Sequence, residues 1–298
     1  MSDALKPPII LFGNFRSGTT MLQRVIATHP DVVSWYEPVG LWLYADPTRE
    51  HDQFEASDAT DDVKRYIRDK FLNYQQDHGN HMIVEKTPHN ILRIPYVRAI
   101  FPDAHFLYIV RDPLSFVSSV ELKWQKPATR KRIFARIAAT PVWHLHHYFK
   151  RFVSQQWNNR ILKRKYLSIW GPRYQGIQQD LRATDLLTVV ARQWSRAASK
   201  AEADIARFDD GRVLTLRYED FIAQPVAGLE RICAHCGLQM TAEMAAMVRD
   251  MVKTDRTLKW QRFDPRDLAR IMPELADGMD RNGYEIPAEV AEADAREP

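Results

Sequence analysis

The sequence predicts an α/β fold in which helices flank a central parallel β-sheet on both faces. Two observations support this: short β-branched, apolar runs recur along the chain, and segments with helical spacing separate them. Strands that alternate with helices form parallel sheets, because each helix returns the chain to the start of the next strand. Hydrophobic residues make up 45% of the 298 residues and charged residues 27%, which excludes a disordered or fibrous chain.

The first strand and helix are expected at residues 9–28. The run Ile-Ile-Leu-Phe at 9–12 is typical of a buried parallel strand, and it ends at Gly13. Residues 18–28 carry apolar side chains at helical spacing. This helix should stop before Pro30, because a residue that precedes a proline avoids the α conformation.

Further strands and helices continue this pattern. The strands are expected at residues 82–84, 105–110 and 212–216. The helices are expected at residues 63–74, 91–100, 186–208 and 225–236. Asp112 and Pro113 form a typical start for another helix, and Gly237 is typical of a helix end.

We expect one domain over residues 1–298, with a mostly helical insertion at 122–185 where the strand–helix alternation breaks. The 2 cysteines cannot form a disulfide framework, which indicates a reducing compartment. No segment approaches the ~20 apolar residues of a membrane helix. A cytoplasmic protein is therefore expected, and its oligomeric state is left open.

The segment from Gly13 to Thr20 predicts an anion-binding loop, so the fold is expected to be P-loop-like. Its Gly-x-x-x-x-Gly spacing lets backbone N–H groups converge on an anion at the positive end of the following helix. Nucleotide-hydrolysing P-loops continue with lysine. Here Thr19 has that position and the cation lies inside the loop as Arg16, which argues against hydrolysis of ATP or GTP.

A second anion site is predicted at Arg111 and Ser119. Arg111 follows the strand at 105–110, at the end where ligands of open α/β sheets bind. Ser119 lies eight residues later on the expected helix. Two separated anion sites at one sheet edge suggest a ligand with phosphate groups at both ends.

Taken together, these motifs resemble the sulfotransferase family, in particular the branch that sulfates carbohydrates. The resemblance covers residues 8–121 and 186–285, whereas residues 122–185 match no known pattern. It is specific because several motifs occur in the family's order. The motifs are Arg16-Ser17-Gly18-Thr19-Thr20, His29-Pro30-Asp31-Val32, Glu37-Pro38 with Trp42, Glu85-Lys86-Thr87-Pro88, Ile109-Val110-Arg111-Asp112-Pro113 with Ser119, and Arg217-Tyr218-Glu219-Asp220.

The resemblance implies an enzyme that uses 3′-phosphoadenosine-5′-phosphosulfate as sulfuryl donor and needs no metal. The acceptor would be a hydroxyl on a carbohydrate, a glycolipid or another polar small molecule. The residues implied to bind the donor are Arg16, Ser17, Gly18, Thr19 and Thr20 for the 5′-phosphosulfate, Arg111 and Ser119 for the 3′-phosphate, and Tyr218 for the adenine.

Arg16 and Lys86 are the candidate catalytic cations. Charge develops on the bridging and sulfonate oxygens during sulfuryl transfer, and fixed cations there lower the barrier. Lys86 follows a predicted strand that should end at the same sheet edge as the anion-binding loop. Many soluble family members carry lysine where this chain has Arg16, and arginine is common there in the carbohydrate-type branch.

Glu37 and His89 are the candidates for the base that takes the acceptor's proton. The family resemblance places a base at Glu37, and partial burial against Trp35 and Trp42 would strengthen it. Some soluble members use a histidine just after the conserved lysine, but here Pro88 intervenes before His89. We favour Glu37.

The charge distribution bears on the acceptor. The net charge is +4, but residues 122–173 carry thirteen basic residues and no acidic residue, while the rest carries 29 basic and 38 acidic residues. We predict that the insertion is a flap on the acceptor side, facing an anionic acceptor, a membrane surface or solvent. Neutralising Lys163, Arg164 and Lys165 should then raise the acceptor KM and leave donor affinity unchanged. No nucleic-acid partner is expected.

Other motifs receive structural interpretations. Cys233 and Cys236 lie on one helix face and are expected to be buried thiols. Glu219 and Asp220 are expected to form capping and loop hydrogen bonds. Three histidines have no carboxylate or cysteine near them in sequence and are not assigned to a metal: His144, His146 and His147. A polar loop that could close over the 3′-phosphate contains Arg256, Lys259 and Trp260.

Two alternative functions stay open. The first is a P-loop nucleotide-dependent kinase or phosphotransferase, against which the missing lysine counts. The second is a non-catalytic binding module that uses the basic insertion to hold an anionic surface. Response to adenosine 3′,5′-bisphosphate separates both from a sulfotransferase.

Overall fold

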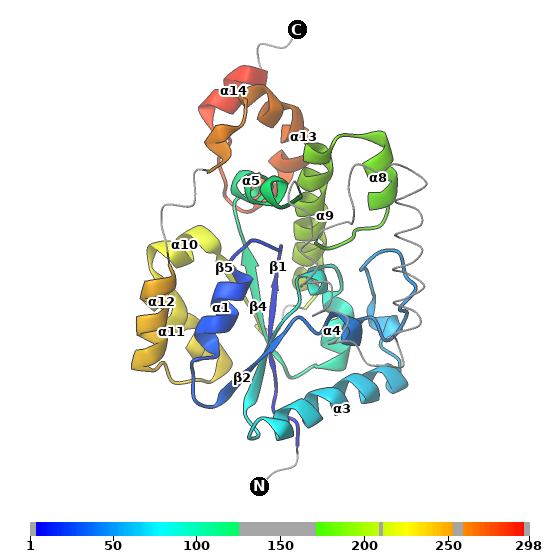
Figure 1. The fold of residues 1–298 in the computed structure, drawn as a ribbon, viewed down its shortest axis with the longest axis vertical. Coiled ribbons are helices and arrows are strands. Elements are labelled where there is room, and N and C mark those ends of the chain that lie inside the picture. The colour runs from blue at the N-terminus through cyan, green and yellow to red at the C-terminus, as the bar shows by residue number, and fades with distance from the viewer. Residues whose placement is uncertain (1–3, 125–170, 209–210, 253–258, 295–298) are drawn as a thin grey trace.

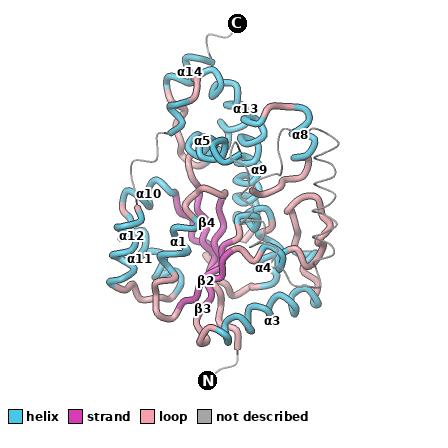
Figure 2. Tube along the Cα trace, viewed as in Figure 1, coloured by secondary structure: helices cyan, strands magenta, loops and turns pink. Residues whose placement is uncertain are grey.

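A central sheet of five parallel strands organises the molecule, in the order β2-β3-β1-β4-β5 (Figures 1 and 2). The structure is a computed structural model that describes residues 4–124, 171–208, 211–252 and 259–294. The strands are β1 (Ile9–Gly13), β2 (Val32–Tyr36), β3 (Met82–Lys86), β4 (His105–Val110) and β5 (Val213–Arg217). Because all strands are parallel, their carboxyl ends share one edge of the sheet.

Helices cover both faces of this sheet (Figure 1). One face carries α1 (Thr19–Ile26), α10 (Tyr218–Ala223), α11 (Pro225–Cys236) and α12 (Ala242–Met251). The other face carries α3 (Asp61–Asp77), α4 (Ile94–Ile100) and α9 (Leu186–Ala206). Beyond the carboxyl edge of the sheet lie α5 (Pro113–Trp124), α8 (Ile177–Ala183), α13 (Pro265–Arg281) and α14 (Ala288–Asp294). The short helices are α2 (Val39–Trp42), η1 (Ala56–Asp58), η2 (Pro88–Leu92) and η5 (Lys259–Arg262).

Strand β1 shows how the sequence pattern produces two cores. Ile10 and Phe12 pack into the cluster on the α9 side, while Ile9 and Leu11 pack into the cluster on the α1 side. Successive strand side chains point to opposite faces, so a strand with helices on both sides is apolar throughout. The predicted α/β class with a parallel sheet is therefore confirmed.

Several element boundaries also agree with the sequence. Asp112 caps α5, since its carboxylate accepts from the N–H groups of Leu114 (3.2 Å) and Ser115 (2.8 Å). Gly237 ends α11 with a left-handed φ of 66°. The segment expected as one helix at 91–100 is instead η2 followed by α4, because Pro95 fits the first turn of a helix but not its interior.

Strand β2 was not expected from the sequence. It is one of the two edge strands, its residues are mostly half-buried, and Ser34 interrupts its apolar run, although its valine and aromatic residues are typical of a strand. Of the expected insertion at 122–185, residues 122–124 end α5 and residues 171–185 include α8, while the flap proper, with Lys163, lies outside the described residues.

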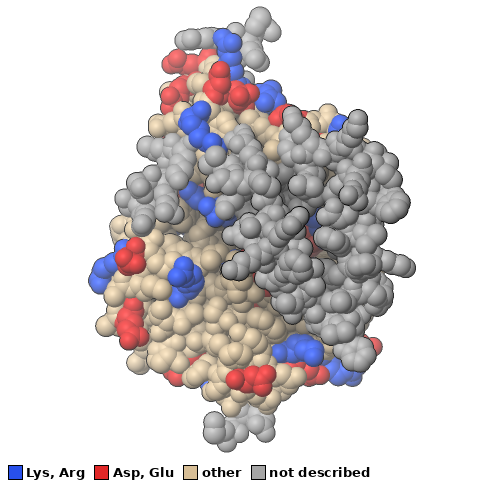
Figure 3. Space-filling view, in the orientation of Figure 1, with Lys and Arg blue, Asp and Glu red and all other residues tan. Residues whose placement is uncertain are grey.

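Charged side chains of both signs are interspersed over the described part of the face in Figure 3. Within the described ranges, none of the helices is long and apolar enough to cross a membrane.

Candidate active site

At the carboxyl end of every strand lies a residue or loop that the sequence analysis selected, so all of them lie at the same edge of the sheet. Across the sheet from β2 to β5, the order is Glu37, Lys86, the loop at 14–18, Arg111 and Tyr218. Neighbouring strands lie about 4.8 Å apart, so these groups form a row along the carboxyl edge. The candidate base and one candidate cation lie on one side of the loop, and the candidate nucleotide-binding residues lie on the other.

The loop after β1 has the properties of an anion site. Its turn is closed by the Ser17 N–H, which donates to the Asn14 carbonyl at 3.1 Å. Gly18 precedes α1 in a left-handed conformation (φ 91°), and no side chain caps this helix. The Ser17 hydroxyl is buried and has no hydrogen-bond partner among the residues that the structure describes. A buried hydroxyl beside an uncapped helix start fits an incoming oxyanion.

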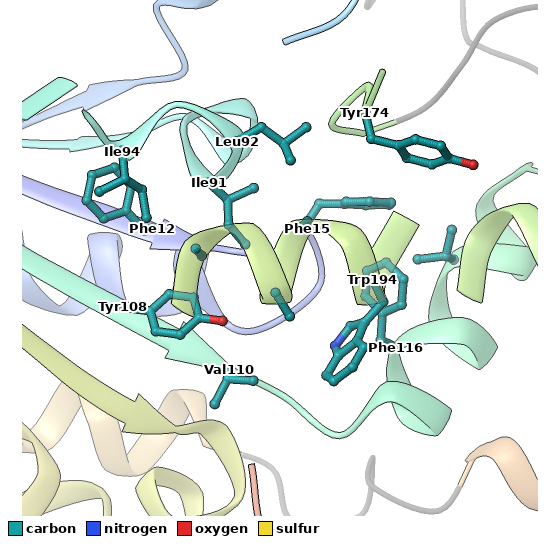
Figure 4. Packing of buried hydrophobic residues seen from close by; sticks show 14 of the residues in the cluster. Phe12, Phe15, Ile91, Leu92, Ile94, Tyr108, Val110, Phe116, Tyr174 and Trp194 are labelled. Atoms are coloured by element: carbon teal, nitrogen blue, oxygen red, sulfur yellow. The ribbon is translucent and has the colours of Figure 1, made fainter. Parts of the chain in front are cut away.

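The loop is held in place by Phe15. This side chain is only 5% exposed and packs edge-on against Phe116 of α5, with ring centroids 5.0 Å apart (Figure 4). Asn14 reaches the carbonyl of Trp194 on α9 at 3.4 Å. Gly171 approaches Phe15 so closely that a Cβ there would lie 2.3 Å from the ring. The loop is therefore fixed by α5, α9 and the chain at Gly171.

The two predicted anion sites touch each other. The Arg16 guanidinium donates through Nε to the Ser119 hydroxyl at 2.9 Å, and Arg111 donates to the Arg16 carbonyl at 2.7 Å. The Arg111 guanidinium lies 4.6 Å from the centre of the Tyr218 ring. Tyr218 also packs on Gly18, where a Cβ would lie 2.7 Å from the ring. Thus both groups of predicted donor-binding residues form one contiguous surface.

Glu37 and Lys86 form an ion pair at the other side of the loop. Lys86 Nζ lies 2.6 Å from Glu37 Oε1, and the side chains are 2% and 21% exposed, respectively. The Glu37 N–H donates to the Lys86 carbonyl at 3.3 Å, and Glu37 itself is left-handed, with φ 48°. Arg16 is also left-handed, with φ 73°. Two non-glycine residues in this conformation indicate local strain at the site.

Trp35 and Trp42 were expected to pack around Glu37, but the structure places their rings elsewhere. Trp35 stacks on Tyr74 of α3, with ring centroids 4.3 Å apart. Trp42 is fully buried, and its indole N–H donates to Glu85 at 3.1 Å. Both rings thus pack into the core, because β2 and α2 turn them toward α3. The partner of Glu37 is the Lys86 ammonium.

Glu85 is a site residue to which the sequence analysis assigned no role. Its fully buried carboxylate accepts hydrogen bonds from Trp42, from Thr87 Oγ1 at 2.5 Å and from Asn90 Nδ2 at 3.3 Å. Burial raises the pKa of Glu85 to about 7, although these hydrogen bonds and Lys86 oppose the shift. Through these contacts Glu85 ties β3, α2 and η2 together. Its position next to Lys86 in the sequence is the signal that could have identified Glu85 as a site residue.

His89 lies on η2 in a buried polar cluster. Its Nδ1 atom is buried and has no hydrogen-bond partner within the described ranges. Burial lowers the pKa of His89 to about 4, against the attraction of Asp52. Asp52 forms an ion pair with Arg173 at 2.6 Å, which joins the segment between α2 and η1 to the segment that precedes α8. His89 is therefore neutral at pH 7 and has a weaker tendency to accept a proton than an ordinary histidine.

The other residues selected from the sequence lie on α1, α10 and α11. Thr19 is 3% exposed, whereas Thr20 is exposed on α1. Glu219 accepts hydrogen bonds from the Asp112 N–H (3.1 Å) and the Tyr284 hydroxyl (2.8 Å), which agrees with its expected structural use. Cys233 and Cys236 are buried free thiols, as expected.

The C-terminal loop was only partly located by the sequence. Trp260 is 9% exposed and packs in the core, while Arg256 and the Lys259 side chain lie outside the described residues. Arg262, which the sequence analysis did not single out, donates to the Ser118 carbonyl at 2.8 Å and so lies beside Ser119. The histidines at 144–147 also lie outside the described residues. Among the residues that the structure describes, no group of three or more His, Cys, Asp or Glu side chains could hold a metal.

Comparison with known proteins places this site in a family. Residues 7–170 and 159–242 match the sequence profile of the Sulfotransferase family. The chain belongs to the sulfotransferase family. This confirms the family predicted from the motifs.

Relatives of known structure support the same fold. The sulfotransferase domain from the curacin biosynthetic pathway superposes with a TM-score of 0.54 at 14% identity, covering 95% of this chain and 100% of that chain. The sulfotransferase domain from the Synechococcus PCC 7002 olefin synthase superposes with a TM-score of 0.53 at 14% identity, covering 95% and 96%, respectively. At this identity the likeness shows the fold alone.

One curated relative is nodulation protein NoeE of Sinorhizobium fredii (strain NBRC 101917 / NGR234). It is 25% identical over 150 residues, which are 44% of this chain and 36% of NoeE. The chain thus spans about a third of the length of this relative.

Proposed function

We propose that this sulfotransferase-family protein transfers a sulfuryl group from 3′-phosphoadenosine-5′-phosphosulfate to a hydroxyl of a polar acceptor. The observation that carries the proposal is the row of groups at the carboxyl edge of the sheet. A predicted anion-binding loop, whose buried Ser17 hydroxyl has no partner in the described part of the chain, lies between the Glu37–Lys86 pair and the surface formed by Arg111, Ser119 and Tyr218. This row provides one site for each end of the donor and one for the acceptor hydroxyl.

The donor-binding residues act mainly by position and charge. The N–H groups at the start of α1, Ser17 and Arg16 receive the phosphosulfate, and Arg111 and Ser119 receive the 3′-phosphate. In the present arrangement Arg16 donates to Ser119. A donor that supplies an oxyanion to each of them replaces this contact with two charge-assisted ones, so the donor itself orients Arg16 toward the sulfonate.

The transfer step needs a cation for the sulfonate and a base for the hydroxyl. The acceptor oxygen forms a bond to sulfur while the bond from sulfur to the phosphate oxygen breaks, and adenosine 3′,5′-bisphosphate leaves with that electron pair. Lys86 and Arg16 stabilise the negative charge on the oxygens. Glu37 takes the hydroxyl proton.

Glu37 is favoured over His89 by the structure's geometry. Its carboxylate is partly exposed and lies 2.6 Å from the ammonium that we assign to the sulfonate. When Lys86 turns to a sulfonate, the Glu37 carboxylate loses its main partner and becomes available to a hydroxyl. Burial lowers the pKa of His89 to about 4, so His89 is a weaker base than an ordinary histidine.

Two features support a polar acceptor, such as a carbohydrate or glycolipid. The Glu37-Pro38 motif resembles that of the carbohydrate branch, and the Glu37–Lys86 ion pair lies where we propose that the acceptor hydroxyl binds. The alternative is a P-loop phosphotransferase. It is disfavoured because Thr19, which is 3% exposed, occupies the position of the phosphate-binding lysine.

Calorimetric titration with adenosine 3′,5′-bisphosphate and with Mg²⁺–ATP tests the proposal. We expect binding of the bisphosphate and a loss of about tenfold or more in affinity for Arg111→Ala, which removes a charge-assisted contact. Arg65→Ala on α3, whose side chain is 67% exposed, is the matched control and should bind normally. Binding of Mg²⁺–ATP without binding of the bisphosphate would reject the proposal. A screen of hydroxyl acceptors with labelled donor then measures transfer directly.

A further inference from the structure

Tyr36 is an aromatic side chain at the candidate site that the fold leaves exposed. It ends β2, and 61% of its surface is accessible. Among the described residues, the other large hydrophobic side chain with high exposure is Ile286, at 41%. The rings near Tyr36 in sequence behave differently, because Trp35 stacks on Tyr74 and Trp42 is fully buried. Exposure of Tyr36 thus calls for an explanation that core packing does not provide.

The reacting groups lie next to this ring. Tyr36 is the register partner of Lys86 on the neighbouring strand, and Lys86 Nζ lies 4.6 Å from the ring centre. Glu37 follows directly in the chain and holds the same ammonium at 2.6 Å. A hydroxyl that gives its proton to Glu37 therefore places the carbon skeleton that carries it against Tyr36.

We propose that Tyr36 is the acceptor-binding platform and that the acceptor group is a pyranose sugar ring stacked on it. The inference rests on the proposed function and specifies its acceptor. Tyrosine presents a large, rigid, amphipathic surface whose ordering costs little conformational entropy. The C–H face of a pyranose packs on that surface, and its hydroxyls reach the polar groups beside the ring, including Glu37 and Lys86.

The polarity around Tyr36 favours a sugar over an apolar alcohol. A lipid or steroid acceptor is held by a pocket lined mostly with apolar and aromatic side chains. In the described part of the chain, the other aromatic residues of this segment, Trp35 and Trp42, point into the core. Tyr36 is instead flanked by an ion pair. One aromatic surface with charged hydrogen-bonding groups at its side suits a ring that is apolar on its face and polar at its rim.

Saturation-transfer NMR titrations test this inference with defined probes. The probes are the methyl pyranosides of glucose, galactose, mannose and N-acetylglucosamine, and the open-chain polyol sorbitol, each added to protein saturated with adenosine 3′,5′-bisphosphate. We expect at least one pyranoside to bind more tightly than sorbitol. Tyr36→Ala should weaken that pyranoside about tenfold, the size of other ring-stacking contributions. Tyr36→Phe should retain the binding, and Ile286→Ala is the matched control for an exposed apolar side chain.

The results separate this inference from the proposed function. If the bisphosphate binds but no pyranoside does, or if sorbitol binds equally well, the sugar platform is rejected and the sulfotransferase proposal stands. Equal pyranoside affinity in wild type and Tyr36→Ala also rejects it. If the bisphosphate does not bind, the proposed function fails, and the same titration on the protein alone decides the role of Tyr36.

Discussion

Removal of one partner of the Glu37–Lys86 pair should destabilise the protein unequally. Lys86 is 2% exposed and Glu37 is 21% exposed. Glu37→Ala leaves an ammonium in the interior without its carboxylate, whereas Lys86→Met leaves a carboxylate that water can reach. Breaking a buried pair costs about 3–5 kcal/mol, and an exposed pair contributes about 1 kcal/mol or less. We therefore expect losses of about 3 kcal/mol for Glu37→Ala and about 1 kcal/mol for Lys86→Met.

Urea unfolding at pH 7 measures this difference. Glu37→Gln keeps an oxygen that accepts from the ammonium, so its loss should lie below that of Glu37→Ala. Lys64→Met is the matched control, because Lys64 pairs on the surface with Asp61, which is 98% exposed, and should change little. Equal losses for Glu37→Ala and Lys86→Met, or a larger loss for Lys86→Met, would refute the reasoning from burial.

Lys86→Met also distinguishes a role in donor binding from a role in the transfer step. Lys86→Met should lower the transfer rate by about 10²-fold or more, since it removes one preorganised charge from the sulfonate site. It should leave the affinity for adenosine 3′,5′-bisphosphate unchanged, because that molecule has no sulfonate. A large loss of bisphosphate affinity would place Lys86 at a phosphate instead.

Three other changes have defined outcomes. Gly18→Ala puts a Cβ at left-handed φ and 2.7 Å from Tyr218, so calorimetry should show weakened bisphosphate binding. Asp52→Ala leaves the Arg173 guanidinium without its carboxylate in the interior, and urea unfolding should show a loss of about 3 kcal/mol. Burial gives Glu85 a pKa of about 7 against 4.5 when unfolded, so the folded state keeps a proton that the unfolded state loses. Wild-type stability relative to Glu85→Gln should therefore fall as pH rises from about 4.5 to about 7 in a urea titration series, and level off above that.

The inner strands could be predicted from sequence because burial on both faces leaves a continuous apolar run. β1, β3 and β4 carry this signature, and Gly13 marks where β1 ends. β5 is the second edge strand and is mostly half-buried, but its Val-Leu-Thr-Leu run still predicts a strand. The other edge strand, β2, has the sequence Val-Val-Ser-Trp-Tyr, whose β-branched and aromatic residues are typical of a strand, so the sequence held a signal that the prediction did not use.

The positions of the site residues were predicted better than their contacts. Parallel strands guarantee that Lys86 and Arg111 reach one edge, whereas Glu37 reaches it by way of β2, which was not expected. The pairing of Glu37 with Lys86 depends on strand register, and local sequence does not encode register. Likewise, the bond between Asp52 and Arg173 joins residues 121 positions apart, which no local pattern reveals.

The left-handed backbone at Arg16 and Glu37 affects both the folding stability and the reactivity of this protein. Such a conformation costs about 1–2 kcal/mol per non-glycine residue, which glycine would avoid. The chain instead places at these two positions the guanidinium and the carboxylate assigned to the reaction. Arg16→Gly would thus relax the backbone while removing a reactive group, whereas Glu37→Gly would relax the backbone but also leave the buried Lys86 ammonium without its carboxylate. Folding stability and reactivity are opposed at Arg16, so the reaction centre itself limits how rigid this sheet edge can become.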